Sequence, residues 1–585
     1  MRASPRLLLL SLVAGLALAL PTAAGADVSD AVSTFTYTSN MHPLGYSPRV
    51  VPFSGAGSGI FNSDLTFWGK KAYQGTYEGF RIIDITEPDN PVELENFTGC
   101  VQGTTTGNQG DVAVWRNILV RSWNSPAPAG GAVCGGIVTP AFQEGVHVFD
   151  VSDPAHPVVL KFVRTPCGSH TLTVVPDLAN DRILVYSDAS SSAPGCEGVD
   201  IIQVPLANPA AASYLRLEPS GNPWGIFVEV AGVTYGATGA SFGPAPPEAG
   251  ISGDVVLVND GVDTTTDGCE PLVGFPAGAI ALLDRGTCTF VQKVKNAQNA
   301  GAVAVIVVNN VPGPPSTMGG TDPTITIPSA MVSLDDGNAI KASPPATGRI
   351  WLIPPPPNPE RACHDGGVVL GTAMLLTCAG GDGFSVWTLD PTQGGSLTDP
   401  KLLYSQAVSG VSIAHSAAFT WDGKILVFGH EPGGGGEPRC QATSATVDKT
   451  LFFFKARTGE SAGSFVLPRP QTEFENCTWH NYNVVPTDKR YVLVSGNYQS
   501  GISVVDFTNP ASASEIAYAD PAPLSSTSLV LGGDWSTYWY NGHIYESDIR
   551  RGLIVWGLSD PAVAGAKKLD HLNPQTEETS FALRP

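Results

Sequence analysis

A short strand motif led by glycine recurs along this chain and constrains its fold more than any other feature. Its copies include GFRIIDITEPDNP from Gly79, GVHVFDVSDPAHP from Gly145, GISVVDFTNPASA from Gly501 and GLIVWGLSDPAVA from Gly552. Glycine admits unusual backbone angles, β-branched and aromatic residues favour a strand, and Asp-Pro or Asn-Pro ends strand pairing because proline has no N–H. We therefore predict that each copy is the same strand of one repeated structural unit.

Each repeat unit opens with an alternating strand that begins at a polar residue. These opening residues are Asp64, Asp111, His170, His364, His415, His480 and Asp534. Uninterrupted units begin 47 to 65 residues apart, as from 64 to 111 and from 415 to 480, and turn residues divide them into successive strands. Four-stranded units at this period predict a mainly β fold, a seven-bladed β-propeller. Two stacked β-sandwiches are the alternative, but they give no reason for one motif to return seven times in phase.

The last blade of a propeller usually needs a strand from the other end of the chain. We expect Val32 to Tyr37 or Lys567 to Leu572 to supply it, because both segments read as strands.

A segment with a different sequence pattern is inserted between His170 and His364. GDVVLVNDG from Gly253, GAIALLDRGTCTF from Gly278 and AVAVIVVNN from Ala302 read as strands, and VQKVKNAQNAG from Val291 reads as a helix that glycine ends. Strand, helix and strand in this order predict an inserted α/β unit. We expect propeller segments at 27–225 and 353–585, with the insert at 226–352.

Two resemblances to known families follow from these residues. LLDRGTCTFVQKVKNAQNAGAVAVIVVNN, continued by TITIPSAMVSLDDGNAIKA, resembles the protease-associated (PA) domain. The segments RIIDI, HVFDV and SVVDF resemble the LVIVD repeat of bacterial and archaeal surface propellers. Together the resemblances imply an LVIVD-type propeller that carries an inserted PA domain.

The start of the chain and its cysteines point to export. Arg2 and Arg6, the apolar run from Leu7 to Leu20 and the small residues up to Ala26 predict a signal peptide at 1–26, and a membrane anchor is the weaker alternative because the run is short. No later segment is long enough to span a membrane. We therefore expect a secreted, extracellular protein.

The ten cysteines are expected to form disulfides between sequence neighbours, since an even number in an exported chain indicates disulfides. The expected couples are Cys100/Cys134, Cys167/Cys196, Cys269/Cys288, Cys363/Cys378 and Cys440/Cys477. The formal charge of -21 argues against nucleic acid as a partner.

Peptidase and nucleotide-binding motifs are missing from the sequence, although PA domains usually accompany peptidases. There is no H-E-x-x-H and no G-x-S-x-G, and the pair His430/Glu431 lacks a second histidine one helical turn on. The leading hypothesis is therefore a scaffold that binds a protein, peptide or glycan partner and has no peptidase activity of its own.

The competing hypothesis places a metal-dependent enzyme, redox or hydrolytic, on the propeller axis. His170, His364, His415 and His480 open four successive blades, so their imidazoles are expected to converge there and could bind Zn, Fe or Cu. A hydrated polar channel in which these groups bond to one another is the alternative interpretation.

Overall fold

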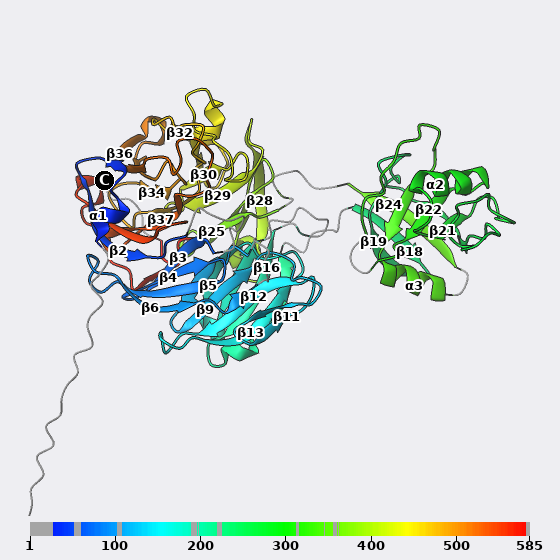
Figure 1. Cartoon of the computed structure of the whole chain (residues 1–585), viewed down its shortest axis with the longest axis horizontal. Coiled ribbons are helices and arrows are strands. Elements are labelled where there is room, and N and C mark those ends of the chain that lie inside the picture. Colours follow the sequence, from blue (N-terminus) through cyan, green and yellow to red (C-terminus); the bar gives the residue numbers. More distant parts are fainter. Residues whose placement is uncertain are drawn as a thin grey trace, which may run out of the picture.

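In the computed structural model, most strands belong to four-stranded antiparallel units arranged around one axis (Figure 1). The structure describes residues 27–580 apart from 52–59, 102–107, 189–195, 197, 219–224, 312–314, 344–345, 355–359 and 361, so the predicted signal peptide at 1–26 lies outside the described residues. Within each unit except the last, the strands follow chain order from the axis outward.

The first three units precede the insertion. Their strands are β3 (Asn62–Trp68), β4 (Lys71–Thr76), β5 (Gly79–Asp84) and β6 (Val92–Phe97); β8 (Val112–Trp115), β9 (Ile118–Trp123), β12 (Glu144–Asp150) and β13 (Val158–Thr165); and β14 (Thr171–Asp177), β15 (Arg182–Asp188), β16 (Val199–Pro205) and β17 (Ser213–Glu218).

Three further units follow the insertion. Their strands are β25 (Asp365–Val369), β26 (Leu375–Gly380), β27 (Gly383–Thr388) and β28 (Lys401–Ala407); β29 (Ala414–Phe419), β30 (Ile425–His430), β31 (Thr450–Lys455) and β32 (Ser461–Val466); and β33 (Asn481–Val484), β34 (Val492–Gly496), β35 (Ile502–Asp506) and β36 (Ser514–Pro521).

The last unit joins the two ends of the chain. It consists of β37 (Asp534–Tyr540), β38 (His543–Asp548), β39 (Gly552–Leu558) and, outermost, the N-terminal β2 (Met41–Pro48). The prediction for this position was wrong: β1 (Phe35–Tyr37), after the short helix α1 (Val28–Ala31), instead pairs with β36, and β40 (His571–Leu572) pairs with β3.

The innermost strands contact one another in sequence and close a ring. β3 lies against β8, β8 against β14, β14 against β25, β25 against β29, β29 against β33, β33 against β37, and β37 against β3. This arrangement is a β-propeller. The predicted number of blades stays a prediction, because the last two units share one hydrogen-bonded sheet through the pair Asn481 and Ser536.

The glycine-led motif forms the third strand of its unit and the turn that follows. In the last copy, Asp560 caps a single turn of 3-10 helix, Pro561–Val563, by accepting a hydrogen bond from the Ala562 N–H at 2.8 Å. Pro561 occupies the first position of that turn, where no N–H is needed. The Asp-Pro pair therefore ends one strand and starts the connection to the next.

The inserted segment forms a mixed sheet with two helices. Its strands in sheet order are β19 (Val233–Ala237), β18 (Gly225–Val230), β24 (Thr347–Ile353), β20 (Ile251–Leu257), β21 (Ile280–Asp284), β22 (Ala304–Val308) and β23 (Ser329–Val332). The helices are α2 (Phe290–Asn299) and α3 (Leu334–Ala342), and Figure 1 draws this unit in green, beside the propeller.

Five disulfides join the ten cysteines in the expected couples. Cys100–Cys134 links β7 (Cys100–Val101) to β10 (Ala132–Cys134), which also pairs with β11 (Ile137–Thr139). Such a number of disulfides indicates an oxidising environment outside the cytoplasm. Among the described residues, no helix combines the length and the apolar character needed to cross a membrane.

In three of the five disulfides, Cys167–Cys196, Cys269–Cys288 and Cys440–Cys477, neither cysteine belongs to a strand or helix. Cys196 lies before β16 and is bonded to Cys167, with their Cα atoms 5.3 Å apart. Cys288 lies between β21 and α2 and is bonded to Cys269, with their Cα atoms 5.8 Å apart. The first bond therefore fastens the segment before β16 to the one before β14, and the second fastens the start of α2 inside the insert.

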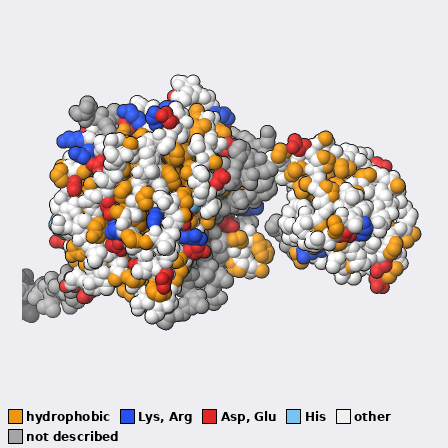
Figure 2. All heavy atoms as spheres, turned by 90° about the horizontal axis from the view of Figure 1, so that it is seen from above, with side chains coloured by type: hydrophobic (Ala, Val, Ile, Leu, Met, Phe, Trp, Pro, Cys, Tyr) orange, Lys and Arg blue, Asp and Glu red, His pale blue; other side chains and the backbone are white. Residues whose placement is uncertain are grey.

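Charged side chains are dispersed over the surface that Figure 2 shows. There the described Lys and Arg side chains lie singly among acidic and uncharged ones. The acidic composition is therefore not offset by a continuous basic patch on this face.

Deleting residues 226–352 tests the predicted domain boundaries. β18 and β24 pair antiparallel, with Ile226 opposite Leu352, so the chain enters and leaves the insert at neighbouring positions. Joined by a short Gly/Ser bridge, the propeller should stay soluble and unfold in one cooperative calorimetric transition, and the excised 226–352 fragment should fold alone. A matched deletion of the β29–β32 unit should abolish cooperative unfolding. Aggregation of both the bridged propeller and the fragment would contradict these boundaries.

Candidate metal centre

Four of the predicted axial residues lie side by side at one end of the propeller axis. His170, His364 and His480 directly precede the innermost strands β14, β25 and β33, and His415 lies in β29. The ring centroids are 4.4 Å apart for His170 and His364, 4.2 Å for His364 and His415, and 4.3 Å for His415 and His480. They converge because equivalent positions of successive inner strands face the same axis.

Neighbouring groups orient three of the imidazoles through their Nδ1 atoms. Asn124 Nδ2 lies 3.0 Å from His170 Nδ1, Ser416 Oγ contacts His415 Nδ1, and the Trp535 carbonyl contacts His480 Nδ1. His364 Nδ1 has no hydrogen-bond partner within the described part of the chain. These contacts occupy Nδ1 and leave the Nε2 atoms of His415 and His480 facing a carboxylate.

That carboxylate belongs to Glu431, which follows β30 and which the sequence analysis considered only as part of a protease motif. Its Oε2 lies 3.8 Å from His415 Nε2 and its Oε1 lies 3.7 Å from His480 Nε2. The Tyr498 hydroxyl donates a hydrogen bond to Oε1 at 2.7 Å. Burial raises the pKa of Glu431 to about 7. One ligand atom each from His364, His415 and Glu431 lie within 4.8 Å of one another.

Burial also sets the charge of the histidines. It lowers the pKa of His170 to about 4 and of His480 to about 3, and it lowers the pKa of His364 and His415 well below the usual value. All four side chains are therefore neutral near pH 7, which is the form of imidazole that binds metals. The cluster combines nitrogen donors with one carboxylate.

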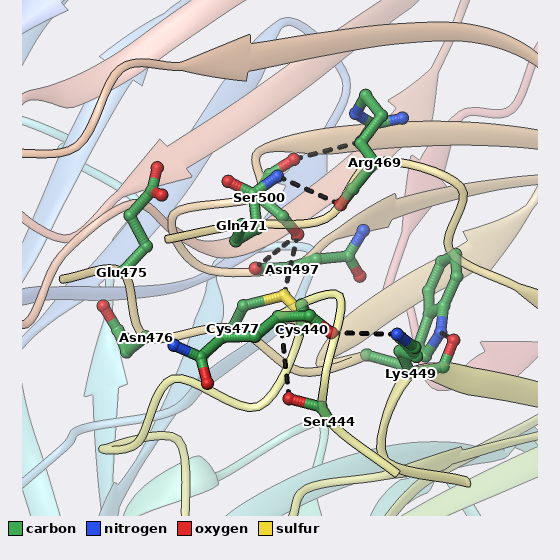
Figure 3. Close-up of a disulfide and its surroundings, with 12 residues drawn as sticks. Cys440, Ser444, Lys449, Arg469, Gln471, Glu475, Asn476, Cys477, Asn497 and Ser500 are labelled. Carbon is green, nitrogen blue, oxygen red and sulfur yellow. Dashed lines mark hydrogen bonds between the residues drawn. A yellow bond between two sulfur atoms is a disulfide. The ribbon is translucent and has the colours of Figure 1, made fainter. Parts of the chain in front are cut away.

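The disulfide Cys440–Cys477, drawn in Figure 3, joins the loop after β30 to the segment before β33. Glu431 is the first residue of this loop. Cys440 lies on this loop, and Cys477 lies just before His480. Asn476 Nδ2 donates to the Gly435 carbonyl at 2.9 Å, and the Gln471 N–H donates to the Cys440 carbonyl at 2.9 Å. The link therefore ties the segment before His480 to the loop that positions Glu431.

The other disulfides do not add sulfur ligands to the axial cluster. Among the described groups of side chains that could hold a metal, none contains Cys196 or Cys288, and the one group with cysteines places the bonded pair Cys363 and Cys378 beside Asp188. A sulfur atom in a disulfide is no thiolate, the form of cysteine that binds metals. These cysteines are therefore structural links and not part of the candidate site.

Two of the aspartates that open repeat units share a cavity with these histidines. Asp64 and Asp111 line a small cavity together with His170, His415 and His480, and Asp111 also accepts a hydrogen bond from the Leu172 N–H at 2.6 Å. Burial and the nearby Asp64 raise the pKa of Asp111 well above its usual value. Asp534, which opens the last unit, lies instead with Glu546 and Asp548, and its neighbour Trp535 lines the cavity.

A C-terminal segment crosses the other end of the axis. β41 (Thr576–Glu577) pairs with the end of β25, the Asn573 side chain bonds to the Val114 backbone, and Thr576 Oγ1 donates to the Val174 carbonyl at 2.8 Å. Gln575 Nε2 donates to Asp64 Oδ2 at 3.2 Å. The segment thus covers the axis at the ends of the inner strands opposite the histidines.

Two family models match parts of the chain. One is the PA domain, over residues 251–340, and the other is the LVIVD repeat, over residues 134–165. The chain carries a PA domain and an LVIVD repeat. Both predicted resemblances are confirmed.

Individual relatives match short parts of the chain. An aminopeptidase of Pseudomonas aeruginosa is 55% identical over 49 residues, which cover 8% of this chain and 9% of the relative. Vacuolar-sorting receptor 7 of Arabidopsis thaliana is 37% identical over 93 residues, covering 14% of this chain and 15% of the receptor. The chain thus spans only a small share of either relative.

Two solved structures also align with parts of this chain. BSAP, a zinc aminopeptidase from Bacillus subtilis, aligns at 26% identity over 22% of this chain and 31% of that chain, with a TM-score of 0.19. The periplasmic gluconolactonase PpgL of Pseudomonas aeruginosa aligns at 8% identity over 89% of this chain and 98% of that chain, with a TM-score of 0.41.

Asp188→Asn should reduce the loss of stability that we expect at higher pH. Burial raises the pKa of Asp188 from 3.8 to about 8, so the folded chain binds this proton more tightly than the unfolded chain. Its stabilising contribution is complete below about pH 4 and is lost as pH rises toward 8, by up to about 1.4 kcal/mol per pH unit. In urea unfolding with the disulfides intact, the free energy of unfolding of the variant should rise relative to that of the wild type between pH 5 and pH 8. Asp181→Asn, at an exposed position, should show the same dependence of stability on pH as the wild type. If Asp188→Asn also shows the wild-type dependence, the raised pKa of Asp188 is wrong.

Proposed function

We propose that the propeller binds one transition-metal ion, Zn, Cu or Fe, through the axial histidines and Glu431. The observation that carries this proposal is the contact of four imidazoles with one another, the half-buried His170 and His364 and the buried His415 and His480, of which the last two also face the buried carboxylate of Glu431. Imidazole nitrogen favours these metals over Mg and Ca. His364, His415, His480 and Glu431 would be ligands, with His170 adjacent.

The groups around the cluster suit ligands rather than a solvated polar channel. Bonds from Ser416 and the Trp535 carbonyl fix Nδ1 of His415 and His480 and direct Nε2 toward Glu431, as neighbouring groups do around metal-bound histidines. The Tyr498 hydroxyl donates a hydrogen bond to the same carboxylate. A bound ion would supply Lewis-acid or redox chemistry at this site, and substrate would approach from the histidine end because the C-terminal segment covers the opposite end.

The second proposed role is binding of a protein, peptide or glycan partner by an exported scaffold. The PA domain match and the separate α/β sheet support it, since the unit contains its own hydrophobic core around Val294, Ala297 and Val305. In this role the chain has no peptidase activity of its own. The two roles are compatible, because the PA unit and the axial histidines belong to different sheets.

Metal analysis of the purified chain distinguishes a propeller with a metal centre from a scaffold that binds no metal. Wild type should contain about one equivalent of Zn, Cu or Fe by mass spectrometry after dialysis, and His415→Ala with His480→Ala should lose it. His543→Ala, outside the cluster, is the matched control and should keep the metal. If the wild-type chain lacks metal and also fails to take up Zn²⁺, Cu²⁺ or Fe²⁺ in calorimetric titration, the metal proposal is wrong.

A further inference from the structure

Three of the four axial histidines closely follow a cysteine that forms a disulfide. The cysteine precedes the histidine by at most three residues, in the pairs Cys167 and His170, Cys363 and His364, and Cys477 and His480. The connection before His415 contains no cysteine. Among the disulfides of the propeller, Cys100–Cys134 alone lies away from these histidines in the sequence.

The exception is the histidine that lies inside a strand. His415 belongs to β29, between Ala414 and Ala417, which both pair with β30. His170, His364 and His480 instead lie at the ends of the connections that lead to β14, β25 and β33. A connection between two units is less constrained than a paired strand. A covalent link just before the histidine supplies the constraint that strand pairing supplies for His415.

The link before His364 shows how this constraint acts. Cys363 is bonded to Cys378 in β26, with their Cα atoms 4.9 Å apart. The backbone N–H of His364 donates to the Ala379 carbonyl at 2.7 Å. Two successive residues are therefore held against two successive residues of β26. The inserted unit precedes this point in the chain, so the disulfide anchors the chain between the insert and the histidine.

The other two links fasten their segments in a similar way. Cys167 is bonded to Cys196, which lies before β16, the third strand of the same unit. Cys477 is bonded to Cys440 in the loop that begins with Glu431. All six cysteines of the three links are at most 7% exposed, which suits permanent links rather than disulfides that exchange with thiols in solution.

We propose that these three disulfides are positioning elements that hold His170, His364 and His480 at the propeller axis. The ring centroids of successive histidines are 4.2 to 4.4 Å apart, so displacement of one imidazole changes its contact with the next. The consequence for metal binding rests on the proposed function, because a metal ion needs its ligands held within about 0.5 Å of the binding geometry. The metal centre therefore assembles only after these disulfides have formed.

The test removes each disulfide separately by replacing both of its cysteines with serine in the full-length chain. The three variants are Cys167→Ser with Cys196→Ser, Cys363→Ser with Cys378→Ser, and Cys440→Ser with Cys477→Ser. In each, the dissociation constant for Zn²⁺, measured by competition with a chelator, should rise about 10- to 100-fold, as when other groups that orient metal ligands are removed.

Cys100→Ser with Cys134→Ser is the matched control. These cysteines are 34 residues apart in the sequence, against 29, 15 and 37 residues for the other three links, so the control should lose a similar amount of stability. It should nevertheless bind Zn²⁺ like the wild type. A similar loss in melting temperature in all four variants, with weaker Zn²⁺ binding in only three, separates positioning from stability.

A second measurement needs no metal. Diethyl pyrocarbonate modifies neutral imidazoles, and in the metal-free chain at pH 7 the histidine after the removed link should react several-fold faster than in the wild type. The exposed His156 serves as the internal reference for the reagent. A wild-type chain that takes up no metal would disprove the proposed metal centre, whereas the modification rates still decide whether the disulfides position the histidines.

Any of three results would overturn the proposal. The first is an unchanged rate of histidine modification in all three variants. The second is a Cys100→Ser, Cys134→Ser chain that binds Zn²⁺ as weakly, or exposes the axial histidines as much, as the other variants. The third needs no variant to fold: in the wild type, hydrogen exchange at the backbone N–H groups of His170 and His364 that is much faster than in β29.

Discussion

The pairing of N-terminal β2 with β39 closes the propeller, and the axial geometry depends on it. The two strands are paired from Met41 opposite Leu558 to Pro48 opposite Gly552. A ring of units is held only by contacts between neighbours, so an open last unit would free the strands at both ends of the array. The histidines can face one another only while every inner strand keeps its place around the axis.

Closure gathers polar groups in the most buried part of the fold, where burial sets their charge. Protonated His415 and His480 are disfavoured there, while protonated Asp111, Asp188 and Glu431 are favoured. Burial therefore disfavours both positively and negatively charged side chains at the axis, unless a group of opposite charge is bound beside them. This physical condition makes neutral imidazoles beside a weakly acidic carboxylate suitable for a metal cation.

The repeated strand motif and the insertion could be predicted from the sequence because each has a strong local pattern. The closing strand could not, since Pro43, Gly45 and Pro48 disfavour a strand by local propensity. β2 tolerates these residues because it is the edge strand of its unit, and the outer side of an edge strand needs no N–H donors. Its register also shifts between Pro43 and Gly45. The four histidines were predicted from the spacing of the repeats. Asp534 opens its unit in the same way, but a bulge follows it in β37, and its neighbour Trp535 lines the cavity.

Glu431 shows why spacing of repeats cannot identify the whole candidate site. It comes from a glycine-rich loop, not from an inner strand, and it reaches His415 and His480 because that loop approaches the axis closely. Gly435 permits the approach: its φ is +66°, and a Cβ there would lie 2.5 Å from Glu431 Oε1. A residue with a side chain at 435 would displace the carboxylate. The glycine at 435 is therefore required for the position of Glu431, and this requirement can be recognised only from the folded structure.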